Sequence, residues 1–176
     1  MSAILITGRP GVGKTTFIQN VLKGVDVIAG GFYTREIRTP QGRTGFQIVT
    51  LSGKTGELAS LYKKSSWRVG KYFVNLADLE NIAVREMESA FLRADLVVID
   101  EIGKMELFSE KFRRGLLKIL DSQKLLLATV MLHSSPFTDR IKNRSDVQLF
   151  EINVRNRELI TTKIIEIINN QIIRVK

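Results

Sequence analysis

The 176-residue sequence contains no cysteine and a single histidine, His133. Without cysteine the chain forms no disulfide bond and no thiolate metal site, and one histidine excludes a multi-histidine metal site. The longest apolar run, from Leu125 to Leu132, is far too short to cross a bilayer. The N-terminus lacks the basic segment and apolar run of a signal peptide. We therefore expect a soluble, cytoplasmic protein without membrane contacts.

Acidic residues are fewer than basic ones, with 18 Asp and Glu against 27 Lys and Arg, which gives a formal net charge of +9. A basic surface attracts polyanions, either nucleotides or nucleic acids. No nucleic-acid-binding motif accompanies the charge, so we favour the nucleotide and keep nucleic acid as an alternative partner. Because no long heptad pattern or apolar stripe is evident, we expect a monomer.

Apolar and amphipathic segments alternate along the chain. Apolar runs predict buried strands at residues 3–7, 25–29, 95–101, 124–131 and 147–153. Helical spacing predicts helices at residues 14–23, 78–93, 108–120, 136–142 and 155–173, with Asp78 and Ser109 as N-caps of two of them. This alternation predicts an α/β, three-layer sandwich with a mainly parallel sheet. Ligands of such sheets bind at the carboxyl ends of the strands.

Residues 32–75 are richer in β-forming residues than the rest of the chain. The segments 32–38 and 45–51 flank a turn at residues 39–43, which predicts an antiparallel hairpin, and residues 72–75 predict a further strand. A segment of about 45 residues rarely folds alone. We therefore expect a β-rich insertion at about residues 32–75 within one domain of residues 1–176.

The segment GRPGVGKT matches the phosphate-loop pattern G-x-x-x-x-G-K-[ST] in full. Its glycines let backbone N–H groups approach phosphate oxygens, and the next helix presents its positive end to the same anion. We expect Lys14 to reach the β- and γ-phosphates, Thr15 to bind Mg²⁺ and Thr16 to touch the α-phosphate. The predicted loop comprises Gly8, Arg9, Pro10, Gly11, Val12, Gly13, Lys14, Thr15 and Thr16.

Two acids end the apolar run DLVVIDE. Asp100 is placed to hold Mg²⁺ together with Thr15, directly or through water. Glu101 is suited to position or deprotonate the attacking water. The letters DEIG also fit the D-x-x-G of GTP-binding switches. Since no N-K-x-D or T-K-x-D follows Met131 or Phe150, a guanine-specific switch is disfavoured.

Four segments together carry a family resemblance: GRPGVGKTT, GGFYTREIR, DEIGKMEL and NVRNRE. They resemble the small nucleoside-triphosphatase family of thermophilic archaea and bacteria, which includes the human cancer-related nucleoside-triphosphatase. The resemblance implies a RecA-like P-loop core with a small antiparallel β insertion. It also implies slow, Mg²⁺-dependent hydrolysis of ATP, GTP, CTP and UTP. The second nucleotide-proximal stretch that it implies comprises Asp100, Glu101, Ile102, Gly103, Lys104, Met105, Glu106 and Leu107.

Hydrolysis also requires positive charge against the γ-phosphate. Lys14 supplies part of it, and an arginine or lysine finger in cis could supply more. Four residues are candidates for this finger: Lys104, Arg140, Lys142 and Arg144. For each of them, the alternative is a side chain that only faces solvent.

Other conspicuous side chains favour structural or solvent-exposed positions. We expect Arg35 and Arg38 to face water, and Phe32 and Tyr33 to pack in the core rather than stack on a base. Trp67 is expected to be buried.

The leading interpretation is a nucleoside-triphosphate phosphohydrolase with Lys14, Asp100 and Glu101 as its catalytic residues and Thr15 and Asp100 as its metal ligands. Water held by Glu101 would attack the γ-phosphate in line. One alternative is a nucleotide or small-molecule kinase in which residues 134–144 form a lid. A second is a nucleotide-dependent switch that binds nucleic acid or protein.

Overall fold

The computed structural model describes residues 3–173, so residues 1–2 and 174–176 of the predicted domain lie outside it. Its strands are β1 Ala3–Thr7, β2 Ala29–Thr39, β3 Gly42–Thr50, β4 Thr55–Ser60, β5 Arg68–Val69, β6 Tyr72–Val74, β7 Leu96–Ile102, β8 Leu125–Val130 and β9 Val147–Glu151. Its α-helices are α1 Lys14–Lys23, α2 Leu76–Asp78, α3 Arg85–Arg93, α4 Glu110–Leu120, α5 Pro136–Lys142 and α6 Arg157–Ile173. A π-helical segment, Leu79–Val84, joins α2 to α3, and a 3-10 turn, Glu106–Phe108, precedes α4.

The strands form one mixed sheet in the order β5-β6-β4-β3-β2-β7-β8-β1-β9. From β2 to β9 the neighbouring strands pair in parallel, while β3, β4, β6 and β5 extend the sheet with antiparallel pairs. The predicted hairpin is confirmed as β2 and β3. The β-rich insertion is therefore a continuation of the same sheet.

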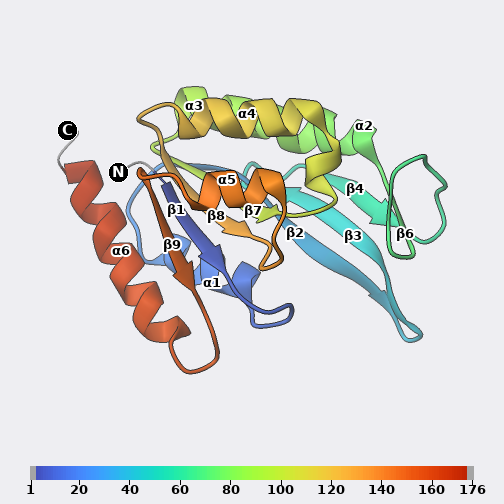
Figure 1. Cartoon of the computed structure of the whole chain (residues 1–176), viewed down its shortest axis with the longest axis horizontal. Coiled ribbons are helices and arrows are strands. Elements are labelled where there is room, and N and C mark those ends of the chain that lie inside the picture. The colour runs from blue at the N-terminus through green and yellow to red at the C-terminus, as the bar shows by residue number, and fades with distance from the viewer. Residues whose placement is uncertain (1–2, 174–176) are drawn as a thin grey trace.

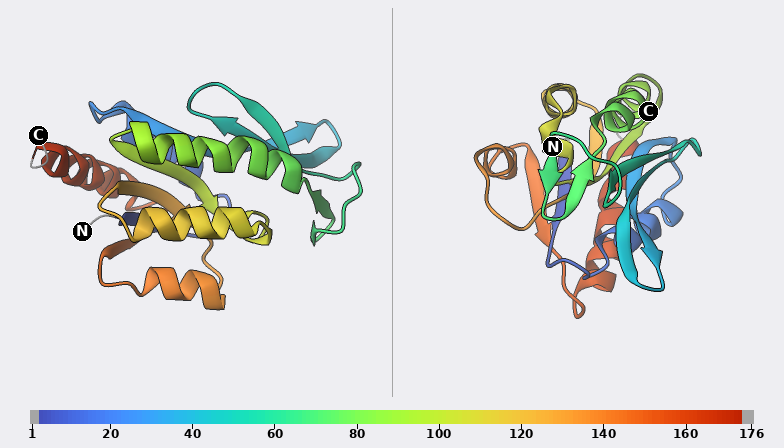
Figure 2. Two further views of the ribbon diagram at one scale, coloured as in Figure 1. Left: turned by 90° about the horizontal axis from the view of Figure 1, so that it is seen from above. Right: turned by 90° about the vertical axis from the view of Figure 1, so that its right-hand side faces the viewer.

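Helices cover both faces of the sheet (Figures 1 and 2). Figure 2 shows α3, α4 and α5 side by side on one face, and α1 and α6 lie on the other. On the first face Phe32 meets Phe112 edge-on, with 6.4 Å between ring centroids. On the second, Phe17 of α1 and Ile164 and Ile168 of α6 are buried together. The predicted three-layer α/β arrangement is thus confirmed.

The strand predicted at residues 25–29 is wrong. β2 begins only at Ala29, where the predicted strand ends, and continues through Gly30 and Gly31. Gly31 has φ +129°, and a Cβ atom there would lie 1.9 Å from the carbonyl oxygen of Val98 on β7. Two glycines therefore let β2 approach its neighbours closely rather than stop it.

The N-cap predicted at Asp78 is also wrong, because the helix starts earlier. The side chain of Asn75 caps α2 by accepting a hydrogen bond from the Asp78 N–H. The carboxylate of Asp78 instead accepts a 2.8 Å bond from the Glu57 N–H on β4. A backbone N–H 21 residues away in the chain thus takes the place of the helix N-terminus as the hydrogen-bond partner of Asp78.

Two burial predictions fail at the ends of the sheet. β9 is an edge strand paired only with β1, and Leu149 on it is 44% exposed, so it is not a core strand. Trp67 is 43% exposed and packs on Phe108, with 5.2 Å between ring centroids. No helix within residues 3–173 is long and apolar enough to cross a membrane.

The N-cap of α4 gives a stability prediction. The buried Ser109 hydroxyl accepts a 3.1 Å bond from the Phe112 N–H and donates a 2.9 Å bond to Glu80. We expect Ser109→Ala to lower the free energy of unfolding by about 1–2 kcal/mol, since the orphaned N–H loses its acceptor. Denaturant unfolding measures the difference, with the exposed Ser66→Ala as control. Equal unfolding midpoints for the two variants would contradict it.

Candidate functional site

The phosphate loop connects the buried strand β1 to α1. Gly11 and Gly13 adopt φ +79° and +92°, a region that glycine enters without steric cost. α1 begins at Lys14 and carries no acid in its first turn. Its free N–H groups and positive end therefore stay available to an anion.

Lys14 lies across the loop. Its side chain is only 11% exposed, and its Nζ atom lies 3.4 Å from the Gly8 carbonyl oxygen. The same nitrogen lies 3.7 Å from Oε1 of Glu101, at the carboxyl end of β7. The two residues that were predicted to face the γ-phosphate are therefore brought together from opposite parts of the chain.

Asp100 is buried, with 2% of its surface exposed. Its Oδ2 atom accepts a 2.5 Å hydrogen bond from the Thr15 hydroxyl, and Oδ1 accepts one from Thr129 on β8. The fold thus joins Thr15 and Asp100, which lie 85 residues apart in sequence. Hydroxyl and carboxylate oxygens are hard donors of the kind that Mg²⁺ prefers.

Burial raises the pKa of both strand-end acids. For Asp100 the rise is opposed by the hydrogen bonds from Thr129 and Thr15 and by the charge of Lys14. For Glu101 burial again dominates, Lys14 opposes it, and the negative charge of Asp100 adds to it. A carboxylate with a raised pKa is a stronger base, which suits proton transfer from water.

Glu106 is a third carboxyl group behind these two. It is 4% exposed, and its Oε2 atom accepts a 3.2 Å bond from the Gly103 N–H. Burial raises its pKa to about 8, and the charges of Glu101 and Asp100 add to the rise. Glu106 is therefore protonated at neutral pH and holds the turn after β7.

A cavity of about 590 Å³ lies between the phosphate loop and the β2–β3 hairpin, at the carboxyl ends of the strands. In Figure 1 the loop and the hairpin tip both lie at the lower side of the sheet. The cavity is lined by Pro10, Gly11, Gly13, Lys14, Thr15, Thr16, Gln19, Tyr33, Thr34, Arg35, Glu36, Arg38, Arg43, Phe46, Asp100 and Glu101. The predicted loop residues and both strand-end acids therefore share one cavity.

The hairpin lining adds residues to the site that the sequence interpretation assigned to solvent or to the core. Arg35 and Arg38 are exposed, yet they face the cavity rather than open solvent alone. Phe32 is buried as expected, whereas Tyr33 lines the cavity. Arg43 also lines the cavity, and no pattern in the hairpin sequence predicts its place there.

The stretch predicted to follow Glu101 at the nucleotide lies outside the cavity lining. Ile102, Gly103 and Glu106 are buried, and the Gly103 N–H donates a hydrogen bond to the Glu106 carboxyl group. Lys104 is exposed and does not line the cavity either. The hydrogen bond from the Gly103 N–H to Glu106 closes a turn directly after β7. This turn leads the chain away from the cavity.

The finger candidates near α5 are also engaged elsewhere. Arg144 binds Asp146 and Asp121, beyond the C-terminus of α5. Lys142 donates a 2.8 Å bond to the carbonyl oxygen of Met131. Neither these two nor Arg140 lines the cavity.

A further basic residue that was not predicted borders the loop. Arg157, the first residue of α6, places Nη1 3.5 Å from the position that a Cβ on Gly13 would take. It belongs to the NVRNRE segment, so the sequence pattern did mark its neighbourhood.

Comparisons with known proteins show the family to which the chain is related. A family model described as NTPase matches residues 3–165. The nucleoside-triphosphatase THEP1 of Thermotoga maritima is 52% identical over 165 residues, which is 94% of each chain.

Two solved structures share the fold. The crystal structure of THEP1 from Aquifex aeolicus has a TM-score of 0.87 at 36% identity and covers 94% of this chain and 98% of its own. The solution structure of a human cancer-related nucleoside triphosphatase has a TM-score of 0.78 at 34% identity and covers 97% and 98%. The chain therefore belongs to this NTPase family, as its sequence resemblance indicated.

Proposed function

We propose that this protein is a nucleoside-triphosphatase that slowly hydrolyses ATP, GTP, CTP and UTP to the diphosphate and phosphate with Mg²⁺. The observation that carries the proposal is the single cavity that joins the phosphate loop, the Thr15–Asp100 pair and Glu101. The relatives are nucleoside-triphosphatases by name, which supports the reaction type. The phosphate loop on a parallel sheet also supports a RecA-like P-loop core.

The residues present fit a magnesium ion. The Thr15 hydroxyl and the Asp100 carboxylate already touch, and both offer oxygen donors. They would hold Mg²⁺ next to the triphosphate. The bound ion supplies positive charge to the β- and γ-phosphate oxygens during hydrolysis.

In this mechanism the Glu101 carboxylate orients a water and accepts its proton. The water oxygen forms a bond to the γ-phosphorus while the bond from phosphorus to the bridging oxygen breaks. The electron pair stays on the departing diphosphate, and Lys14 donates hydrogen bonds to the phosphate oxygens. Burial raises the pKa of Glu101 and so makes it a better proton acceptor.

Broad base specificity rests on the family resemblance and on the lack of a guanine-reading N-K-x-D or T-K-x-D segment. Within the part of the chain that the structure describes, residues 134–144 do not line the cavity, so the structure gives no support to a kinase lid there. Monomeric state and cytoplasmic location stay predictions.

The first test measures phosphate release from ATP, GTP, CTP and UTP, with and without Mg²⁺ and with no acceptor present. We expect release from all four nucleotides in the presence of Mg²⁺ and none after its chelation. Asp100→Asn is expected to raise the Mg²⁺ concentration required for half-maximal release, because it removes the carboxylate that meets Thr15. Nucleotide binding without release by the wild type would favour the kinase or the switch instead.

A further inference from the structure

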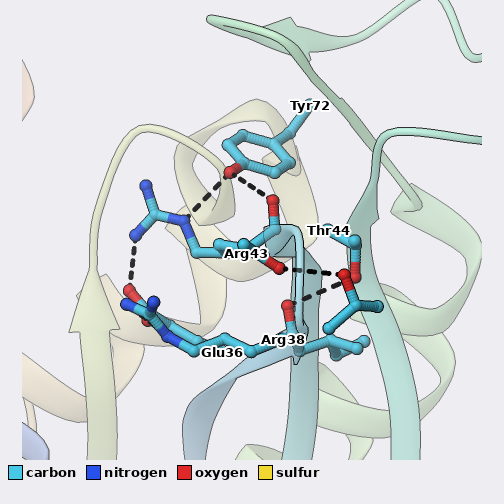
Figure 3. Close-up of polar contacts among 8 residues, drawn as sticks. Glu36, Arg38, Arg43, Thr44 and Tyr72 are labelled. Atoms are coloured by element: carbon cyan, nitrogen blue, oxygen red, sulfur yellow. Dashed lines mark hydrogen bonds and ion pairs between the residues drawn. The ribbon is translucent and has the colours of Figure 1, made fainter.

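Two arginines of the β2–β3 hairpin converge on one carboxylate at the edge of the cavity (Figure 3). The Nε atom of Arg38 donates a 2.7 Å bond to Oε2 of Glu36, and Nη1 of Arg43 donates to Oε1. Both guanidinium groups therefore use a single acceptor group. The hairpin is tied at this point by a 3.3 Å bond from Thr44 to the Ile37 carbonyl oxygen.

Arg43 is held more firmly than an ordinary surface arginine. Its Nε atom donates a 3.0 Å bond to the Tyr72 hydroxyl, which in turn donates to the Arg43 carbonyl oxygen at 3.2 Å. Its guanidinium carbon lies 4.9 Å from the ring centroid of Phe46 and 5.4 Å from that of Tyr72. Among residues 3–173 no side chain accepts a hydrogen bond from its Nη2 atom. The cation is thus positioned in advance with donor capacity left over.

The arrangement matches the chemistry of a phosphate group. Guanidinium groups bind carboxylates and phosphates through the same forked hydrogen bonds. Partial burial opposes the ionisation of Glu36, but the bonds from Arg43 and Arg38 outweigh it and lower its pKa, so Glu36 is an anion at neutral pH. Glu36 therefore occupies the donors that a phosphate oxygen would use.

The location of the pair decides which phosphate it meets. The phosphate loop with Lys14 and the two strand-end acids Asp100 and Glu101 line the same cavity as the arginines. A triphosphate bound to the loop extends its terminal phosphate toward these acids. β2 pairs Tyr33 with Asp100 and continues from that point into the hairpin that carries the arginines. The basic residues near α5 do not line this cavity, so the hairpin arginines are the cations that share its lining with Lys14.

We propose that Arg43, assisted by Arg38, binds the γ-phosphate from the hairpin side, and that Glu36 holds the two arginines until the nucleotide displaces it. The inference rests on the proposed function, since it names a residue for the same reaction. Arg43 acts as the finger in cis: its guanidinium donates to the γ-phosphate oxygens as the bond to water forms and the bond to the diphosphate breaks.

The test compares Arg43→Ala, Arg43→Lys and Glu36→Gln with the wild type and with Arg68→Ala, an exposed insertion arginine outside this cavity. The readouts are phosphate release and the affinities for a non-hydrolysable triphosphate analogue and for the diphosphate. We expect Arg43→Ala to lower kcat about 10²-fold or more, by analogy with other cis fingers. It should also abolish the preference for the triphosphate analogue over the diphosphate and leave diphosphate affinity unchanged.

The kcat of Arg43→Lys should lie between those of the wild type and Arg43→Ala, because a lysine keeps the charge but not the forked pair of hydrogen-bond donors. Glu36→Gln should raise affinity for the triphosphate analogue, since the competing anion is gone. Equal losses for analogue and diphosphate in Arg43→Ala, or no gain in Glu36→Gln, would show that the contacts only stabilise the hairpin. If the wild type releases no phosphate, the hydrolase proposal fails, while the affinity ratio still decides the role of Arg43.

Discussion

We expect Glu101→Gln to lower the rate of phosphate release by about 10²- to 10⁴-fold, the usual contribution of a general base. Glutamine has nearly the same shape but cannot accept a proton from water. The change also removes the anion that lies 3.7 Å from Lys14. Lys14 is then free to bind phosphate oxygens, so nucleotide affinity should be retained or rise.

Two measurements separate chemistry from binding in this variant. Single-turnover phosphate release reports the chemical step, and binding of a non-hydrolysable triphosphate analogue reports the affinity. The matched control is Glu88→Gln, an exposed acid of α3 outside the cavity. If Glu101→Gln keeps the rate of this control, Glu101 is not the group that activates water.

The parts of the site that lie within one continuous segment were predictable from the sequence. The phosphate loop needs glycine, lysine and threonine at fixed spacing between a strand and a helix, and each constraint is local. The acid that ends β7 was predictable for the same reason, because parallel strands bring their carboxyl ends to one edge. The contact between Thr15 and Asp100 follows from these two rules together.

The failures arise where distant segments decide a side chain's surroundings. Arg35 and Arg38 reach the cavity because β2 pairs with β7 in the register that sets Tyr33 beside Asp100 and lets the hairpin project past it. Nothing within the hairpin sequence specifies that register. Arg144 similarly meets Asp121, 23 residues away, at the far end of α4. Charge pattern alone identified these residues as basic but could not place them.

Glu106 carries the second large expected effect, on stability. Its folded-state pKa of about 8 exceeds the ordinary 4.5, so the folded protein keeps a proton that the unfolded chain releases. The free energy of unfolding should therefore fall as pH rises from 4.5 to 8 and then level off. A shift of this size corresponds to a loss on the order of 5 kcal/mol. Glu106→Gln has no such proton, so we expect its stability advantage over the wild type to grow across this range.

Guanidinium unfolding of the wild type and Glu106→Gln from about pH 5 to about pH 9 measures that advantage. Burying the extra amide N–H of glutamine shifts the stability difference by the same amount at every pH. The slope of this difference against pH is therefore the decisive quantity. Glu110→Gln on α4 corrects for the loss of one exposed carboxyl group. A stability difference that does not change with pH would mean that folded Glu106 has the ordinary pKa of 4.5. In that case a nearby cation would have to stabilise the buried carboxylate, because the bond from the Gly103 N–H alone would not suffice.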